Sequence, residues 1–394
     1  MAKFNFTSAI SPYVKALPDS GLGKFMEMTA DNPDIISLSV GEPNFDVPPK
    51  VREATIESIK NGHSNYTSTL GMFELRSAIS KDIERNYGVK YNPRSEILVT
   101  VGVSEALFTV IRTLVGDGDE VILPEPCYIS NKACIILAGG TPVPVETYME
   151  DGFIPTIAAL EKAVTPKTKA IMFGYPNNPT GAIMSKEQIK NIGDWAVKHN
   201  LIVISDELYA HLTYGGHKHH IFTCFPEFRD RTIVLNGFSK AYAMTGLRLG
   251  YILAPKELIK AANDVHQQLV LCPPVTSQYG AIAALRYCEP DMLDMMAHYD
   301  KRRKIMIDGI KKIGLPLYAP EGAFYIFPCI KQTGLTSIEF VEKLLKEENV
   351  LVLPGHIFGA GGEGYVRLSY AYSEETLHKA LEHLARFIKK YTKK

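Results

Sequence analysis

The segment around Lys240 combines a reactive side chain with surroundings that could activate it. Lys240 lies among small residues directly after an apolar run, in a string that extends over residues 236–250. Partial desolvation there would lower the pKa of the amine and make it competent to form a Schiff base. Arg248, eight residues further on, carries a permanently charged fork that suits phosphate. If each residue is considered alone, a structural role is favoured, with Lys240 on the surface and Arg248 in a salt bridge.

A second segment, residues 100–106, could bind an anion. It passes from an apolar run through Gly102 to Val103 and Ser104, where a helix is expected to begin. The free N–H groups of a helix start, together with the Ser104 hydroxyl, favour a phosphate. Many strand-to-helix turns look alike, so the segment alone is equally compatible with a purely structural role.

Two more polar segments follow apolar runs. Asp206 comes just after the most apolar run of the chain, with Tyr209 three residues on. A carboxylate there is costly to bury unless it meets a cation or a protonated nitrogen, although a helix N-cap is the alternative role. Asn178 lies in a turn that Pro179 and Gly181 make rigid, which would hold its amide in place as a donor.

All four segments are expected at the carboxyl ends of strands, where open α/β sheets bind ligands. Together they offer a reactive amine, a phosphate cradle, a carboxylate and two donors to a phenolic oxygen. Pyridoxal phosphate requires that combination. The groups that would supply it are Lys240, the stretch from Gly102 to Ser104 with Arg248, Asp206, and the pair Asn178 and Tyr209.

Apolar runs alternate with amphipathic stretches from about residue 95 to 270, which predicts β-α-β units around a buried parallel sheet. Helices are expected at 104–114 and at 186–198, the second opened by a capping pair, Ser185 and Gln188. We predict an α/β fold with a doubly wound, mainly parallel, seven-stranded sheet. Its strands are expected at 97–101, 121–123, 142–146, 169–174, 201–205, 232–236 and 249–253.

Beyond residue 274 the pattern changes to a smaller α+β domain. Long helices are expected at 292–313, 337–348 and 375–391, with strands at 322–328 and 364–370. We divide the chain into an N-terminal arm with part of the small domain (1–46), a large domain (47–285) and a small C-terminal domain (286–394). The arm is too short to fold alone and is expected to pack on the second domain or on a neighbouring subunit.

The amino-acid composition limits the classes of molecule that the protein is expected to bind. Forty-three basic residues balance forty-three acidic ones among 394 residues, which argues against nucleic acid and favours small molecules. The six cysteines form no C-x-x-C pair, and we expect no metal site. Without a leader-like start or a long apolar run, we expect a cytoplasmic protein with no membrane contact.

The chain resembles the class I, fold-type I aminotransferases along essentially its whole length, and it looks most like bacterial and archaeal alanine, aspartate and aromatic aminotransferases. The strings that carry the resemblance lie at 39–45, 66–68, 126–128, 178–181, 206–209, 239–240, 322–325 and 365–369. Two positions depart from the common pattern. Gly237 stands where many relatives have a phosphate-binding serine, so that contact is missing or comes from Ser239, and Leu247 replaces a frequent tryptophan.

The resemblance implies a role for each site residue. Lys240 would bind the cofactor covalently, Asp206 would pair with its pyridine nitrogen, and Tyr128 would stack on its ring. Arg367 would clamp the substrate carboxylate, with Asn178 and the Gly41 backbone nearby. Tyr66, counted with Lys240 and Asp206 as catalytic, would reach the site from the other subunit of a homodimer. The remaining cofactor contacts would come from Gly102, Val103, Ser104, Asn178, Tyr209, Ser239 and Arg248.

The activity implied is transfer of an amino group from an L-amino acid to a 2-oxo acid such as 2-oxoglutarate by a ping-pong cycle. Alanine is the first expected donor, followed by aspartate and aromatic amino acids. A C–S β-lyase reaction on the same scaffold is the nearer alternative. A pyridoxal-phosphate sensor domain is more remote, because no basic helix-turn-helix region precedes the pattern.

Two other patterns suggest different chemistry. The string at 359–364 spells G-x-G-x-x-G, the fingerprint of an NAD-dependent dehydrogenase, but it leads into an expected strand rather than a helix. Four histidines, His211, His217, His219 and His220, could suggest a metal site. Their spacing matches no common ligand set, so we read them as a solvated loop.

Overall fold

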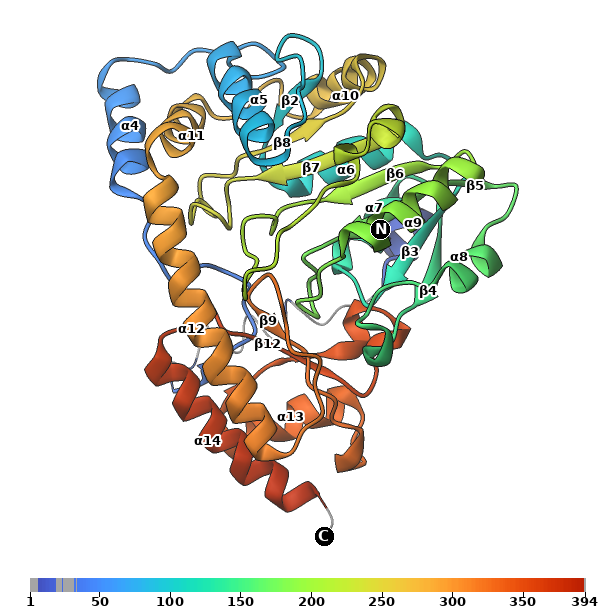
Figure 1. The fold of residues 1–394 in the computed structure, drawn as a ribbon, viewed down its shortest axis with the longest axis vertical. Helices are drawn as coiled ribbons and strands as arrows, with labels where there is room; N and C mark the ends of the chain where they lie inside the picture. The colour runs from blue at the N-terminus through green and yellow to red at the C-terminus, as the bar shows by residue number, and fades with distance from the viewer. Residues whose placement is uncertain (1–5, 19–22, 24–31, 33, 393–394) are drawn as a thin grey trace, which may run out of the picture.

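The computed structural model describes residues 6–18, 23, 32 and 34–392. A large sheet with helices on both faces forms the upper part of Figure 1, and long helices with short strands form the lower part. Two short helices, α1 (Phe6–Ala9) and α2 (Pro12–Lys15), precede these parts, and α2 lies against α7 (Ile129–Leu137).

The large sheet has seven strands in the order β2-β8-β7-β6-β5-β3-β4. The pairs from β7 through β6, β5 and β3 to β4 are parallel, whereas β8 is antiparallel to both of its neighbours. The predicted α/β fold with its mainly parallel sheet is therefore confirmed. The strands are β2 (Ile97–Thr100), β3 (Glu120–Glu125), β4 (Thr141–Glu146), β5 (Thr168–Gly174), β6 (Ile202–Asp206), β7 (Thr232–Gly237) and β8 (Gly250–Leu253).

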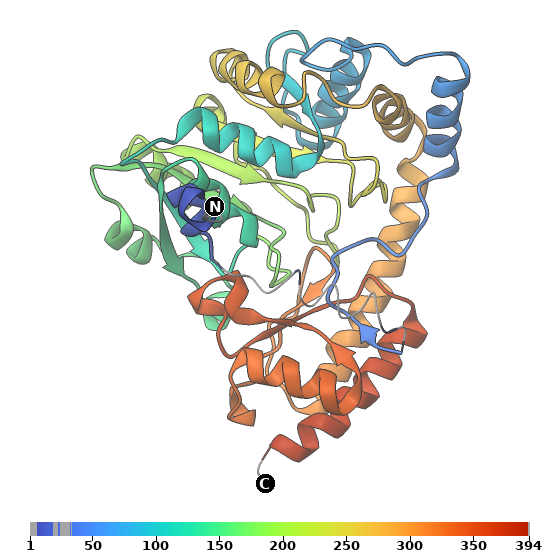
Figure 2. The same cartoon turned by 180° about the vertical axis from the view of Figure 1, so that it is seen from behind.

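Alternating side chains of the central strands enter two different cores. In β5, Ile171 and Phe173 belong to one apolar cluster and Ala170 and Met172 to another, as expected when both faces of a strand are covered. The first face is covered by α8 (Ile157–Ala163) and α9 (Lys186–Lys198). The second is covered by α6 (Gly102–Leu114), α7 and α10 (Lys256–Leu269), and α6 crosses this face in Figure 2.

The expected cap of α9 is present. Ser185 Oγ accepts a hydrogen bond from the Gln188 backbone at 3.2 Å, and Gln188 Oε1 accepts one from the Ser185 backbone at 2.8 Å.

Three further helices, α4 (Pro49–Lys60), α5 (Phe73–Tyr87) and α11 (Val275–Tyr287), share a third apolar core with β2, β7 and β8. No helix in the described ranges is long and apolar enough to cross a membrane.

The second part is built on α12 (Glu289–Ile313), α13 (Ser337–Glu348) and α14 (Glu374–Tyr391). A three-stranded antiparallel sheet joins them, in the order β11 (Leu353–Pro354), β12 (Val366–Ser369) and β9 (Tyr325–Ile326). The expected helices are present, while the two expected strands are shorter than predicted. The proposed domain boundary at residue 286 falls in the last turn of α11.

The N-terminal segment joins this second part. Strand β1 (Ile36–Ser37) pairs in parallel with β10 (Val350–Leu351), and the Leu38 backbone donates to the Leu351 carbonyl oxygen at 2.8 Å. Residues 36–38 thus pack as expected for the arm, whereas α2 departs from the expectation because it lies on α7 of the large domain. The pairing of β1 with β10 places the residues that follow β1, 38–42, between the second part and the carboxyl ends of the large sheet's strands.

Candidate active site

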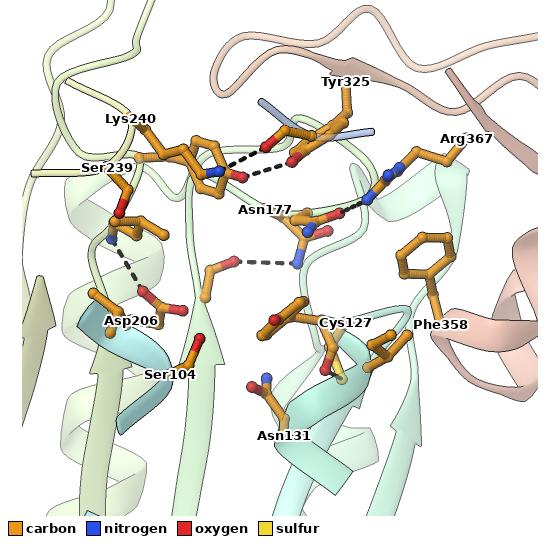
Figure 3. Close-up of a pocket in the computed structure, with 18 of the residues that line it drawn as sticks. Ser104, Cys127, Asn131, Asn177, Asp206, Ser239, Lys240, Tyr325, Phe358 and Arg367 are labelled. Carbon is orange, nitrogen blue, oxygen red and sulfur yellow. Dashed lines mark hydrogen bonds between the residues drawn. The ribbon is translucent and has the colours of Figure 1, made fainter. Parts of the chain in front are cut away.

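A cavity of about 360 Å³ lies where the carboxyl ends of β2, β5, β6 and β7 face the second part of the molecule. Figure 3 shows that Asp206, Ser239 and Lys240 enter it from the large sheet, whereas Tyr325, Phe358 and Arg367 enter it from the second part. Eleven residues proposed from the sequence line this cavity. They are Gly41, Val103, Ser104, Tyr128, Asn178, Asp206, Tyr209, Ser239, Lys240, Arg248 and Arg367.

Lys240 lies a few residues past the end of β7 and points across the cavity. Its Nζ donates a hydrogen bond to the Gly41 carbonyl oxygen at 2.6 Å. Burial lowers the pKa of Lys240 to about 8; the positive charges of Arg367 and Arg248 also lower it, while Glu42 acts in the opposite direction. A substantial fraction of the amine is therefore neutral and nucleophilic near physiological pH.

Asp206 ends β6, and its carboxylate lines the cavity. Its Oδ1 accepts a hydrogen bond from the Leu208 backbone at 3.0 Å. Residues 208–211 form turns, so the alternative role as a helix N-cap is not realised. Burial, helped by the nearby Glu207 carboxylate, raises the pKa of Asp206 to about 7, although the Leu208 hydrogen bond and Lys240 act in the opposite direction. A protonated ring nitrogen placed against this carboxylate would reverse that shift, because an adjacent positive charge favours the ionised form.

Glu207 belongs to a buried network outside the cavity. Ser205 Oγ donates to Glu207 Oε1 at 2.6 Å, and His219 Nε2 lies 2.5 Å from Glu207 Oε2. His219 is only 7% exposed, so the expectation of a solvated loop is wrong for this residue. His217 lies 3.4 Å from a carboxylate oxygen of Glu321 instead. In the described part of the chain, no group of three or more histidine, cysteine or acidic residues could hold a metal ion.

Arg367, on β12, is held from several sides. Its Nη1 donates to Asn178 Oδ1 at 2.9 Å, and its Nη2 donates to the Ser39 carbonyl oxygen. The guanidinium carbon lies 4.4 Å from the ring centre of Tyr325 and 5.1 Å from that of Phe358. This buried, oriented fork suits a carboxylate. Since Asn178 Oδ1 accepts from Arg367, the Asn178 amide nitrogen stays free to donate into the cavity.

The turn that the sequence suggested as a phosphate site lies where α6 begins. Gly102 has a φ of +75°, a backbone conformation that favours glycine, and Nη2 of Arg248 would lie 2.6 Å from a Cβ added there. The N–H groups of Val103 and Ser104 belong to the first turn of α6 and suit an anion. Ser239 lines the cavity and could therefore supply the contact that Gly237 lacks. A Cβ on Gly237 would lie 3.0 Å from the Leu249 carbonyl oxygen, so a larger residue has little room there.

Tyr66 stands apart from these residues. Its side chain is 81% exposed, and it does not line the cavity. Tyr128 does line it, at the N-cap of α7. The string at 359–364 contains a short 3-10 helix, Ala360–Gly362, and leads to β12 rather than to an α-helix. The dehydrogenase alternative therefore lacks the structural context that it needs.

Tyr325 and Glu42 are among the cavity residues that received no role from the sequence. The Tyr325 hydroxyl lies 2.6 Å from the Tyr209 hydroxyl, and the Thr245 hydroxyl donates to Glu42 Oε1. Tyr325 belongs to the string at 322–325, and Glu42 to the string at 39–45, so the resemblance marked both segments. Their contacts join residues far apart in sequence, and no local pattern indicates such contacts.

Comparison with known proteins places the chain in a family. Residues 33–384 match the family described as aminotransferase class I and II, and the chain belongs to it. It is a pyridoxal-phosphate-dependent transaminase that acts on amino and keto acids.

Similar proteins include the putative aminotransferase YugH of Bacillus subtilis, 44% identical over 98% of this chain and 100% of that protein. An aspartate aminotransferase of Pyrococcus abyssi is 40% identical over 97% of this chain and 98% of its own length. Among solved structures, the aromatic aminotransferase of Pyrococcus horikoshii OT3 matches with a TM-score of 0.89 at 41% identity, over 94% of this chain and 99% of that one.

The cavity fits the cofactor of this family. The glycine corner of α6 with Arg248 could hold the phosphate, Asp206 could face the ring nitrogen, and Lys240 supplies an amine of lowered pKa. These are the charges and donors that the cofactor needs at its phosphate, its ring and its carbonyl carbon.

The pKa of Lys240 sets a pH dependence for cofactor uptake. Covalent incorporation of pyridoxal phosphate needs the neutral amine, so its rate should rise with pH and level off above about 8, the lowered pKa. Stopped-flow absorbance after mixing the cofactor-free protein with pyridoxal phosphate measures this rate. A midpoint near 10.5, the ordinary value for lysine, would contradict the activation of Lys240 by burial.

Proposed function

We propose that this transaminase moves the amino group of an L-amino acid to a 2-oxo acid such as 2-oxoglutarate in a ping-pong cycle, with alanine as the first donor and aspartate or aromatic amino acids next. One observation carries the proposal. The Lys240 amine and the Arg367 fork contact the same short segment, Lys240 at the Gly41 carbonyl and Arg367 at the Ser39 carbonyl. An amino acid whose carboxylate binds Arg367 would therefore present its α-carbon near Lys240.

Bound pyridoxal phosphate supplies the carbonyl that takes up the amino group and the ring that accepts the electron pair of the α-carbon. In the proposed cycle, the Lys240 amine would take the proton from the substrate α-carbon and pass it to the former carbonyl carbon of the cofactor, and the second half of the cycle would run in reverse. Asp206 stays ionised and keeps the ring nitrogen protonated. Tyr209 and the Asn178 amide donate hydrogen bonds to the phenolic oxygen. Arg367 binds the substrate carboxylate and fixes the orientation of the α-carbon.

The lining of the cavity supports a donor with a neutral side chain. Among the described residues, its lysines and arginines are Lys240, Arg248 and Arg367, and each already has a proposed role. The Glu42 carboxylate also lines the cavity and would repel a second carboxylate. Leu353, Ile357 and Phe358 add apolar surface, which favours alanine or an aromatic donor over aspartate.

A donor scan tests this function. The protein loaded with pyridoxal phosphate is mixed with alanine, aspartate, glutamate, tyrosine or cysteine, one at a time and without an acceptor. We expect the cofactor absorbance to change to that of stable pyridoxamine phosphate, fastest with alanine, because a half-cycle stops when no acceptor is present. Addition of 2-oxoglutarate should restore the original spectrum.

Two results of the scan would contradict the proposal. Continuous release of a keto acid and ammonia, with the original spectrum retained, would instead indicate a lyase reaction. A fastest change with aspartate would reject the order of donors while leaving transamination intact.

We further propose a homodimer in which Tyr66 completes the site of the other subunit. The 81% exposed Tyr66 ring lies outside its own cavity, which agrees with a role across an interface. Ile56 and Ile59 on α4 are 47% and 64% exposed, and Leu269 at the end of α10 is 48% exposed. Ile56 and Ile59 are three residues apart on α4 and therefore share one face of that helix, which a partner subunit could cover.

A further inference from the structure

Tyr325 lies between the two sides of the cavity. It is the first residue of β9 and is 1% exposed. In Figure 3 it lies between Lys240 and Arg367. A Cβ added to Gly41 would lie 2.0 Å from the Tyr325 hydroxyl, so this ring is packed directly on the segment that both Lys240 and Arg367 contact.

The hydroxyl of Tyr325 faces that of Tyr209 at 2.6 Å. Burial raises the pKa of both phenols above the ordinary range, so both keep their protons. One of these protons lies between the two oxygens, and the other is free to point elsewhere. If Tyr325 donates to Tyr209, the Tyr209 proton can point into the cavity, as its proposed role requires. A donor held by another buried hydroxyl keeps its direction better than one free to rotate.

The ring of Tyr325 performs a second task. The Arg367 guanidinium lies over it at 4.4 Å, and the Phe358 ring is 5.1 Å from the same guanidinium. Hydrogen bonds to Asn178 and Ser39 fix the fork within its own plane. The aromatic face attracts the cation and restricts its tilt out of that plane. Without the ring, the fork would be free to swing away from the carboxylate site.

We propose that Tyr325 is a positioning residue that joins the cofactor side of the site to the carboxylate side, with its hydroxyl orienting Tyr209 and its ring face holding Arg367. The proposal rests on the roles proposed above for Tyr209 and Arg367. The hydroxyl of Tyr325 would affect the cofactor through Tyr209, and its ring would affect substrate binding through Arg367.

Two substitutions separate the parts. Tyr325→Phe removes the hydroxyl and keeps the ring. It should raise the pH midpoint of the cofactor absorbance by about 0.5 to 1 unit, because a poorly oriented donor leaves more negative charge on the phenolic oxygen, which holds nearby protons more tightly. It should also lower kcat about two- to tenfold, the loss of one hydrogen bond, and leave the KM for alanine within about twofold.

Tyr325→Leu removes the ring as well. It should cause the same shift of the midpoint and, in addition, raise the KM for alanine about three- to thirtyfold, the range expected for a lost cation–π contact. Absorbance against pH and steady-state kinetics on the same preparations measure both effects. Tyr370→Phe is the matched control, because this buried tyrosine donates to the Ala323 carbonyl at 3.2 Å and does not line the cavity. It should leave the midpoint and the KM unchanged.

A double mutant tests whether Tyr325 acts through Tyr209. In a Tyr209→Phe background, Tyr325→Phe should shift the midpoint no further. An additive shift, or no shift from Tyr325→Phe alone, would overturn the proposal. The proposed function fails separately: if Arg367→Lys leaves the KM unchanged, the carboxylate role itself is wrong. If Arg367→Lys raises the KM and Tyr325→Leu does not, only the role of Tyr325 is wrong.

Discussion

Replacing Lys240 with alanine should lower the kcat for transamination by at least about 10⁴, the upper range for loss of a general acid–base group. The reason is geometric, because the lining residues within the described ranges include no other lysine. A guanidinium group only donates hydrogen bonds, so Arg248 and Arg367 cannot accept the α-proton in its place. Single-turnover absorbance with alanine, followed for hours, measures the residual rate.

The loss must be separated from a loss of cofactor. Lys240→Ala keeps Ser104, Asp206 and Arg248, so it should still bind pyridoxal phosphate without a covalent bond, as equilibrium dialysis would show. Added methylamine should restore part of the rate, since the shortened side chain leaves space for a small amine. Turnover near that of the unaltered protein would exclude Lys240 as the catalytic amine.

The sequence predicted the framework of the site because its chemistry follows apolar runs. Asp206 ends the strand β6, and Lys240 lies just beyond β7, and these two strands are parallel neighbours. Parallel neighbours place their carboxyl ends at one edge, so residues 34 apart in the chain line the same side of one cavity. Gly102 was also readable, because a strand followed at once by a helix needs a sharp turn.

The contacts across the cavity could not be predicted in the same way. Tyr209 meets Tyr325 over a separation of 116 residues, and Arg367 meets Ser39 over 328. The spacing of apolar residues predicts helices and strands but not contacts between residues so far apart. These contacts depend on how the second part packs against the large sheet. His219 shows the opposite error. Its polar, glycine-rich sequence neighbours predicted an exposed side chain. The His219 ring is buried instead, because it contacts the buried Glu207 carboxylate, which would be costly to leave without a partner.

Arg367→Lys should raise the KM for alanine about 30- to 150-fold, with a smaller effect on kcat. Lysine keeps the charge but not the planar fork, so the hydrogen bonds to Asn178 and Ser39 and the paired contact to a carboxylate cannot all form. The expected cost of about 2 to 3 kcal/mol is at the low end for a buried, hydrogen-bonded charge pair. Initial rates at varied alanine concentration and saturating acceptor provide the KM.

Arg303→Lys provides a demanding control for Arg367→Lys. Arg303 also lies over an aromatic ring, that of Tyr214 at 5.4 Å, and donates to the Pro320 carbonyl at 2.9 Å, but it does not line the cavity. A general loss of packing would affect both variants, whereas a carboxylate role affects only Arg367. Comparing alanine with alaninamide isolates the charge, because the amide lacks the carboxylate. The unaltered protein should prefer alanine strongly, and Arg367→Lys should lose most of that preference; an unchanged preference would mean that the substrate carboxylate binds elsewhere.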